Sequence, residues 1–276
     1  PIIFSVRETA LAGPALLLGL ADFVIMMRDS YSYVSGPRMV QEFTGVPIDP
    51  ETLGGAGKHA QMSGLASFVV PDLDSASEIV DELLGLLPSN SLETPPTSVT
   101  SDPADRSLTD IQNVIPDSKT GSYDMRHIIQ QVVDDQILTE IRKDWATNLI
   151  TALCTVNGNT VGIVANQPQS LAGTLDISAS QKGARFVNFC DAFNIPIITF
   201  VDTPGFQPGK DLEWRGMIRH GAQLAFAYAN STIPRICVTV RKSYGGAYIV
   251  MDSKYMGNDL AFAWPSAEIA VMGAKG

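Results

Sequence analysis

The sequence predicts a mixed α/β fold built from two related halves. Short apolar runs with the length of strands alternate with amphipathic segments of helical periodicity. A stretch rich in Pro, Ser, Thr and Asp divides the apolar part of the chain, and the opening segment can be laid over the closing one. We therefore expect a first half at residues 1–88, a linker at 89–121 and a second half at 122–276.

In the first half, strands are expected at 2–6, 22–27 and 65–70, and helices at 36–43 and 74–87. The apolar run 11–27 is the one stretch that could suggest a membrane span. Asp22 interrupts it, and it is shorter than the roughly 20 residues that a spanning helix needs. We therefore expect a core helix followed by a core strand.

The linker offers no apolar face for packing, and strands alternate with helices again after it. Asn157-Gly158 joins two apolar runs and is the dipeptide that most readily forms a tight hairpin. The remaining elements are expected as helices at 178–193, 215–230 and directly after 245–246, and as strands at 195–202, 235–240, 260–264 and 269–273.

The internal similarity follows two nearly equal offsets. Gly13 and Gly246 lie 233 positions apart, and Gly36 and Gly273 lie 237 apart, so the later copy has four extra residues between them. Chance similarity of two α/β units is the alternative. A duplication would place two similar pockets in one protein. Because each copy lacks material that the other has, we expect both halves to be incomplete at the chain ends, before Pro1 and after Gly276.

The bulk composition limits the classes of function. With 276 residues, 45% of them apolar and 17% charged, the chain can bury a large core. Its net charge of -10 argues against sequence-independent binding to nucleic acid or to an anionic membrane. Three cysteines without a C-x-x-C pair give neither a disulfide framework nor a zinc ribbon. Reduced thiols in a cytoplasmic protein without a metal site fit this pattern.

The strongest local motif is "RKSYGGAYIVM", in which Gly245, Gly246 and Ala247 join a strand to a helix. Small residues at such a junction let backbone amides approach a ligand, and the helix start adds partial positive charge. The motif therefore predicts an oxyanion-binding site. The alternative is that the glycines serve only close packing of helix against strand.

Several motifs together resemble the carboxyltransferase (β) subunits of biotin-dependent acyl-CoA carboxylases of the acetyl-/propionyl-CoA type. They occur in the family's order: "VSGPRMVQEFTG", "LGGAGKHAQMSGLA", "DTPGFQPG", "RKSYGGAYIVM" and "AWPSAEIAVMGAKG". The resemblance covers nearly all of the chain outside the linker. It implies tandem crotonase-like (ClpP/crotonase) halves made of ββα-type repeats, the first mainly holding acyl-CoA and the second mainly holding biotin.

The resemblance also implies a reaction. CO2 passes from carboxybiotin to the α-carbon of a short acyl-CoA, giving malonyl-CoA from acetyl-CoA or methylmalonyl-CoA from propionyl-CoA. The ureido nitrogen of biotin takes the α-proton, and the protein supplies two oxyanion holes. Since no lysine here follows a methionine, as in biotin carrier domains, the biotin belongs on a partner chain. The expected partners are a biotin carboxylase/biotin carrier (α) subunit and further copies of this chain, as a hexamer.

Carried over by motif, the amides of Gly246 and Ala247 should face the ureido oxygen, and those of Ala12 and Gly13 the thioester oxygen. The oxyanion hole at Ala12 and Gly13 departs from the family's Gly-Gly-Ala sequence, because Pro14 follows Gly13 and proline has no N–H. If the repeat is taken literally, Gly13 and Pro14 match Gly246 and Ala247, which would leave half a hole.

Around the second hole, Gly245, Tyr248 and Ile249 are expected to contact substrate. Ile249 lies two positions beyond Ala247, where the resemblance associates the residue with acyl-chain preference, although it could equally be a core residue. His59 could line the channel for CoA, with a purely structural role as the alternative.

His220 is expected to be structural rather than part of the pocket. Asp202 ends a strand and should brace a turn rather than bind a metal. Two other functions stay open: the matching subunit of a biotin-dependent decarboxylase, and a non-catalytic scaffold, which Pro14 and Glu8 favour. A hydratase or hydrolase of crotonase type would need an acid/base carboxylate in the pocket, and none stands out.

Overall fold

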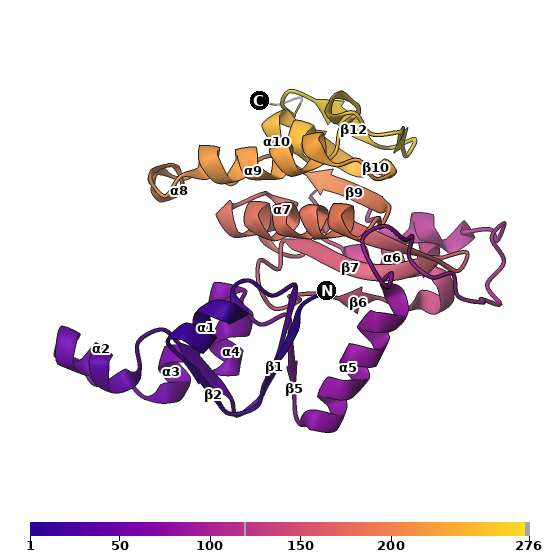
Figure 1. The fold of residues 1–276 in the computed structure, drawn as a ribbon. Helices are drawn as coiled ribbons and strands as arrows, with labels where there is room; N and C mark the ends of the chain where they lie inside the picture. Colours follow the sequence, from indigo (N-terminus) through magenta and orange to yellow (C-terminus); the bar gives the residue numbers. More distant parts are fainter. Residues whose placement is uncertain (119, 274–276) are drawn as a thin grey trace. The chain divides into compact units, whose positions relative to one another are not determined.

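The computed structural model describes residues 1–118 and 120–273. The chain forms two compact units, which Figure 1 traces in sequence colours. The first contains Pro1–Gly85 together with Ile141–Ala146, and the second contains Leu86–Glu140 and the chain from Thr147 onward. The sequence pattern assigned Ile141–Ala146 to the second half, whereas these residues pack with the first unit.

The first unit is built on a three-stranded parallel sheet in the order β1-β3-β5. Its strands are β1 (Ile3–Val6), β3 (Phe23–Met27) and β5 (Phe68–Val70), which confirms the three expected strands. A second, smaller parallel pair joins β2 (Thr9–Leu11) to β4 (Tyr31–Tyr33). This pair was not expected, since three residues give too little alternation to show a pattern.

The helices of the first unit include both amphipathic helices that the periodicity predicted. They are α1 (Gly13–Leu18), α2 (Pro37–Thr44), α3 (Pro50–Gly54), α4 (Ala56–Lys58), the π-helical turn η1 (His59–Ser63) and α5 (Leu73–Leu86). The expectation that the apolar run begins with a core helix is wrong for most of α1. Its Ala15 and Leu18 are buried, but Leu16 and Leu17 are exposed. In the part of the chain described, no helix is long and apolar enough to cross a membrane.

Each face of the β1-β3-β5 sheet has its own core, because neighbouring residues of a strand point to opposite sides. Val24 and Met26 of β3 face the cluster that contains Leu18 of α1. Ile25 and Met27 face the other cluster, which α5 covers through three apolar residues in helical spacing: Ala76, Ile79 and Val80.

The second unit contains a larger sheet in the order β11-β10-β9-β8-β7-β6. Its strands are β6 (Thr139–Glu140), β7 (Leu149–Val156), β8 (Asn159–Asn166), β9 (Ile197–Thr203), β10 (Arg235–Tyr244) and β11 (Leu260–Ala263), and β12 (Glu268–Ala270) pairs with the end of β10. Strands β8 to β11 are parallel. The predicted hairpin is confirmed: β7 and β8 are antiparallel, and Asn157 and Gly158 both have positive φ.

Helices α7 (Ile177–Ala192) and α9 (Met217–Asn230) pack side by side against this sheet (Figure 1). The region expected as one helix at 215–230 begins later than predicted, because Gly216 has φ 95° and separates α9 from the short helix α8 (Lys210–Trp214). The remaining helices are α6 (Met125–Val132), α10 (Gly245–Val250) and the 3-10 turns η2 (Thr109–Val114), η3 (Asp134–Gln136), η4 (Leu171–Gly173) and η5 (Lys254–Met256).

The expectation that the segment 89–121 has no apolar face is wrong near its end. Ile111, Val114 and Ile115, in and after η2, pack against the main core of the second unit. Near the start of the segment, Ser98 donates its amide to the carbonyl oxygen of Gly158 at 2.8 Å. The overall composition of the segment hid these few apolar residues among polar ones.

The strand pairing confirms the internal repeat. In the first copy β1 pairs in parallel with β3, and β2 with β4; in the second copy the start of β10 pairs in parallel with β11, and its end with β12. Under the offsets of 233 and 237 the registers coincide: Ile3–Phe23 with Ile236–Leu260, and Thr9–Tyr31 with Lys242–Glu268. Chance similarity of two α/β units would not align the register of two separate strand pairs.

Candidate functional site

The turn from β10 into α10 brings the Gly-Gly-Ala motif to the surface of the second unit. Tyr244 is extended, with φ -112°, and Gly245 follows with φ +60°. A Cβ at Gly245 would lie 3.3 Å from the carbonyl oxygen of Val271, so this position combines positive φ with close backbone contact. These two constraints explain why the chain has glycine there.

The next two residues present the candidate donors. The first N–H groups of a helix have no acceptor inside the helix. Gly246 is exposed, whereas Ala247 is fully buried as a whole residue. Two adjacent amides in this position match the requirement of an oxyanion hole.

Phe206 forms an aromatic wall beside this turn. A Cβ at Gly246 would lie 3.4 Å from the Phe206 ring, and one at Gly221 of α9 would lie 3.1 Å from it. The backbone around Phe206 is held by Leu175, which donates to the Gly205 carbonyl at 3.1 Å and accepts from the Gln207 amide at 2.8 Å. Sequence reasoning missed Phe206, although it lies inside the motif "DTPGFQPG".

Asp202 lies within β9 and braces the end of this strand against β10, whereas the sequence predicted that it would brace the following turn. Its carboxylate accepts hydrogen bonds from the Tyr123 hydroxyl at 2.8 Å, Arg241 Nε at 2.9 Å and the Lys242 amide at 3.0 Å. Burial, together with the charge of Asp202, raises the pKa of Tyr123 well above its usual value. All partners of this carboxylate are internal, so the network positions the strand that leads into the Gly245 turn.

Tyr248 and Ile249 follow the donors on α10. Tyr248 is half-buried, and burial raises the pKa of its hydroxyl. Ile249 is 47% exposed. The alternative that Ile249 is a core residue facing the sheet is therefore wrong, and the residue is available to a ligand.

The first-half counterpart of this turn is more restricted. Ala12 has φ 57° and ψ -117°, and α1 begins at Gly13. The amide of Ala12 donates to the carbonyl oxygen of Tyr33 at 3.1 Å. This corrects the expectation that Ala12 faces a thioester oxygen, because its N–H is already used between β2 and β4. Gly13 is then the remaining donor of the predicted pair, and Pro14 has no N–H.

The hydrogen bonds of His59 favour a structural role over the predicted contact with substrate. Its Nε2 lies 2.6 Å from the carbonyl oxygen of Ser32, and its Nδ1 lies 2.8 Å from Ser63 Oγ. Both ring nitrogens are therefore occupied within the first unit. His220 also has neighbours within hydrogen-bond distance, as a structural role predicts: its Nδ1 lies 3.2 Å from the side-chain amide nitrogen of Gln181 and 3.0 Å from the side-chain amide oxygen of Gln223.

The cysteines contribute no reactive group to this turn. Cys154, Cys190 and Cys237 are free and buried, and burial raises the pKa of the Cys237 thiol to about 12. Within the described ranges, no group of three His, Cys, Asp or Glu side chains is placed to hold a metal ion.

The sequence of this chain is similar to that of several known proteins. The carboxyl transferase domain family matches residues 1–276. The propionyl-CoA carboxylase beta chain of Sus scrofa is 46% identical over the whole of this chain, which covers 51% of that protein. The methylmalonyl-CoA decarboxylase subunit alpha of Veillonella parvula is 43% identical, again over the whole chain and 54% of that protein.

Among solved structures, a transcarboxylase 12S hexamer with hydrolysed methylmalonyl-coenzyme A bound has a TM-score of 0.97 and 42% identity to this chain. The match covers 99% of this chain and 54% of that one. The chain therefore spans about half the length of its relatives. The tandem crotonase-like fold that the motifs implied is confirmed by this similarity. The last three residues of the motif "AWPSAEIAVMGAKG" lie outside the described residues.

Proposed function

Because the chain belongs to the carboxyl transferase domain family, we propose that it forms the part of an acyl-CoA carboxyltransferase that activates carboxybiotin and a short acyl-CoA. The observation that carries the proposal is the β10–α10 turn, where Gly246 and Ala247 lie in the first turn of α10, whose N–H groups have no acceptor inside the helix, and Phe206 lies beside Gly246. The proposed acyl group is propionyl or acetyl.

The β10–α10 turn fits the head group of biotin. A ureido oxygen needs N–H donors at a surface where no side chain obstructs its approach. Gly246 is exposed, supplies one N–H group and has no side chain. The Phe206 ring offers an apolar contact within van der Waals distance of the same position. When bound, carboxybiotin supplies the CO2 and a ureido nitrogen that accepts the α-proton.

The role of this chain's own residues is electrostatic. Gly246 and Ala247 would hold the ureido oxygen of carboxybiotin, and Gly13 would hold the thioester oxygen, which are the two oxygens where negative charge would develop. Gly246 and Ala247 stabilise the first charge with donors that are already in place, so little reorganisation is needed during the reaction. The brace from Asp202 through Arg241 and Lys242 keeps the strand before the turn fixed.

On the acyl-CoA side, the amide of Gly13 is the proposed donor to the thioester oxygen. Pro14 cannot supply a second donor, because proline has no N–H. One amide can still stabilise part of the thioester charge, and each missing donor of such a hole costs about 3 kcal/mol of barrier. A weaker first hole is consistent with turnover, provided that the second hole is complete. This argues against the alternative of a non-catalytic scaffold, because a scaffold would not need N–H donors at either turn.

Partners follow from the same proposal. The biotin carrier and the ATP-dependent biotin carboxylase belong on another chain. The 12S relative is a hexamer in its crystal structure, and we propose a homo-oligomer, as a hexamer, for the protein that contains this chain.

The decarboxylase alternative has a specific observation in its favour. The Veillonella relative carries the name of a methylmalonyl-CoA decarboxylase subunit and is as similar as several carboxylase subunits. The donors at Gly246 and Ala247 would serve either direction, since the same charges arise in both. The direction of carboxyl transfer therefore depends on the partner subunits.

The test is a product assay with the full-length protein. It is incubated with a carboxybiotin donor and acetyl-, propionyl- or butyryl-CoA, and malonyl-type products are measured by mass spectrometry. The proposal expects methylmalonyl-CoA from propionyl-CoA, with loss of product in a Gly246→Pro variant. Absence of product from every acyl-CoA, together with absence of biotin-dependent decarboxylation of methylmalonyl-CoA, would contradict it.

A further inference from the structure

A buried ion pair joins the start of β10 to the segment that follows α10. Arg235 is the first residue of β10, and its Nη1 contacts the carboxylate of Asp252, with side chains that are 4% and 0% exposed. Its Nη2 donates to the carbonyl oxygen of Met256 at 3.0 Å. The guanidinium therefore closes the chain into a loop that contains the whole turn with Gly246 and Ala247.

Asp252 lies directly after the end of α10. This helix has six residues and is about 9 Å long. Its last turn is closed by the amide of Met251, which donates to the carbonyl oxygen of Ala247 at 3.1 Å. Asp252 follows with φ 52°, and its own carbonyl oxygen accepts from the side chain of Asn258 at 2.6 Å. A displacement of Asp252 therefore reaches the proposed donors through one short helix.

The carboxylate of Asp252 depends on Arg235 for its position. Its Oδ1 accepts from Arg235, whereas its buried Oδ2 has no hydrogen-bond partner among residues 1–118 and 120–273. A buried carboxylate that loses its only donor must take up a proton or move toward another polar group. Loss of the guanidinium should therefore free the segment that ends α10.

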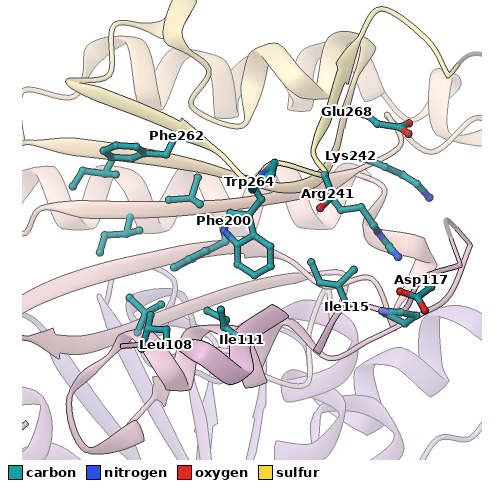
Figure 2. Close-up of a pocket in the computed structure, with 17 residues that line it drawn as sticks. Leu108, Ile111, Ile115, Asp117, Phe200, Arg241, Lys242, Phe262, Trp264 and Glu268 are labelled. Carbon is teal, nitrogen blue, oxygen red and sulfur yellow. The ribbon is translucent and has the colours of Figure 1, made fainter. Parts of the chain in front are cut away.

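The other end of β10 is held by more contacts. Figure 2 shows Arg241 and Lys242 of this strand beside an apolar pocket. Arg241 Nε and the Lys242 amide both donate to Asp202, and the Tyr123 hydroxyl adds a third hydrogen bond. Removal of one of these contacts leaves the others in place. The pair at the start of β10 has no such reserve, so it is the more sensitive support of the turn.

The internal repeat shows that the strand pairing does not need this ion pair. Under the offsets of 233 and 237, Arg235 and Asp259 correspond to Ile2 and Asp22. The amide of Ile2 donates to the Asp22 carboxylate at 2.7 Å, and the Asp22 amide donates back at 2.9 Å. Arg235 and Asp259 exchange the same two bonds at 2.8 and 3.0 Å. The first copy keeps this arrangement with an apolar residue that is 53% exposed.

The ion pair is specific to the second copy, because Ile2 carries no charge. The rise in offset from 233 to 237 gives this copy four extra residues after the turn. Asp252 and Met256, which the guanidinium of Arg235 contacts, lie in this longer segment. The copy with the pair is also the one in which both proposed donors have an N–H, since Pro14 has none in the first copy. The pair therefore accompanies the complete set of donors.

We propose that the Arg235–Asp252 pair positions the donors of the β10–α10 turn for carboxyl transfer. By fixing the end of α10, it holds the amides of Gly246 and Ala247 at the place that the ureido oxygen takes. Both residues are buried and act through the helix, so they are positioning residues. The inference rests on the proposed function, in which donors must be in place before charge develops.

The experiment uses the full-length protein with its biotin carrier and biotin carboxylase. Arg235→Met removes the guanidinium but keeps an apolar side chain of similar length. A double variant, Arg235→Met with Asp252→Asn, also removes the carboxylate that would be left unpaired, so the test does not depend on a variant that contains one. Asp252→Asn alone keeps an oxygen for Arg235. Arg126→Met is the matched control, since it breaks the two hydrogen bonds of Arg126 to Glu140, at 2.7 and 2.8 Å, in the same unit.

Three properties are measured for each variant. They are kcat and KM for propionyl-CoA, amide hydrogen exchange across 245–251 by mass spectrometry without substrate, and the free energy of unfolding in urea. Arg235→Met and the double variant should lower kcat by about 10–100-fold, because a small displacement of catalytic groups has this effect, and should change KM by less than about twofold. Exchange across 245–251 should become about tenfold faster in both.

The other two variants separate position from charge and from stability. Asp252→Asn should keep kcat within about threefold of wild type, because the contact with Arg235 remains. Arg126→Met should lower the free energy of unfolding without changing kcat or the exchange across 245–251. An equal loss of kcat in Arg126→Met would trace the effect to stability alone, and a loss in Asp252→Asn as large as in Arg235→Met would trace it to charge. Either result would overturn the proposal.

Wild-type kcat and wild-type exchange in both Arg235→Met and the double variant would also overturn it, and would leave the proposed function intact. The opposite failure has a different signature. If the wild-type protein transfers no carboxyl group to any acyl-CoA, the proposed function is wrong. The exchange across 245–251 then still decides whether Arg235 and Asp252 hold the turn in place.

Discussion

Ala12 and Gly245, which lie 233 positions apart, adopt the same positive φ at equivalent turns: 57° at Ala12 and 60° at Gly245. Ala12 lies between β2 and the first residue of α1, and Gly245 follows β10 as the first residue of α10. Glycine adopts this conformation without strain, whereas a residue with a Cβ is held there at a cost of about 1–3 kcal/mol. The turn at Ala12 therefore has the same φ as the turn at Gly245, but it has alanine at a position where glycine would be unstrained.

Replacing Ala12 by glycine should therefore stabilise the first unit. The relief of strain outweighs the greater freedom of glycine in the unfolded chain, so we expect a gain of about 1 kcal/mol in the free energy of unfolding. Gly245→Ala should have the opposite effect, with a loss of about 1–3 kcal/mol. Urea denaturation of both variants measures the difference. A loss of stability in Ala12→Gly would show that the backbone at Ala12 is not strained.

At the second hole, Gly246→Pro should reduce carboxyl transfer by about 100-fold or more. Proline removes the N–H that is proposed to stabilise the ureido oxygen, and one lost donor of this type costs 10²–10³ in rate. The readout is kcat with propionyl-CoA. Gly246→Ala is the comparison: it keeps the N–H and adds only a methyl group, whose Cβ would lie 3.4 Å from Phe206, so it should lose less activity than Gly246→Pro. Equal activity of the two variants would contradict the assignment of this amide.

At the first hole, Pro14→Ala should increase the rate. It restores an N–H at the position that the repeat equates with Ala247, where a second donor would strengthen stabilisation of the thioester charge. We expect up to about a tenfold rise in kcat, because the backbone of α1 has not been optimised for a second donor. Pro37→Ala, at the start of α2, is the control for loss of a proline at a helix start. An unchanged rate in Pro14→Ala would mean that this amide position does not face the thioester.

Much of this fold was accessible from the sequence because periodicity and turn chemistry agree with the final structure. The Asn157-Gly158 hairpin, α5 and the parallel strands follow local rules. The failures have physical causes. The pair of β2 and β4 is too short for a pattern, and η2 buries a few apolar residues within a polar segment. Burial of α1 depends on what covers it, and a pattern of apolar residues alone does not contain this information.

The candidate site was predictable only where its chemistry is local. The Gly-Gly-Ala turn is encoded by residue type, so its position was found directly. The hydrogen bond from Ala12 to Tyr33 joins two strands far apart in the sequence, and His59 is held by the carbonyl of Ser32 in the same way. Phe206 was missed because its contacts with Gly221 and Gly246 arise from tertiary packing.

Asp252 should make part of the stability depend on pH. Its carboxylate is fully buried beside Arg235, directly after α10, and burial raises its pKa from the ordinary 3.8 to about 6 despite the nearby guanidinium. The folded protein therefore holds the proton more tightly than the unfolded chain. This contribution to stability is fully present below about pH 4 and is lost as the pH rises through 6.

The measurement is the difference in unfolding free energy between wild type and Asp252→Asn from pH 4 to 7. Asparagine does not titrate and keeps an oxygen for Arg235. Other carboxylates also titrate differently in the folded protein; at Asp134, for example, burial raises the pKa, but hydrogen bonds from the amides of Gly158 and Asn157 outweigh this and lower it. These groups are the same in both proteins, so the difference in unfolding free energy reports on the Asp252 carboxyl alone. Wild type should lose up to about 3 kcal/mol relative to the variant over this interval. A difference that is constant with pH would show that Asp252 is ionised throughout.

Ile249 should set the preference for the acyl chain. It is 47% exposed on α10, two residues after the proposed donor Ala247, so its side chain is available beside the hole. An apolar side chain there favours a short alkyl tail, whereas a carboxylate at the same place would have to lose water as the tail binds. Because one methylene in an apolar pocket is worth about 1–3 kcal/mol, discrimination between acetyl- and propionyl-CoA should be modest in wild type.

The test compares kcat/KM for acetyl-, propionyl- and butyryl-CoA in wild type and in Ile249→Asp. The variant should lose most activity with butyryl-CoA and least with acetyl-CoA, since the longest tail would meet the new carboxylate most closely. Ile218→Asp, at a more exposed isoleucine of α9, controls for a general effect of added charge and should leave the ratios unchanged. If Ile249→Asp also leaves the three ratios unchanged, Ile249 does not contact the acyl tail, and selectivity must come from residues elsewhere in the pocket.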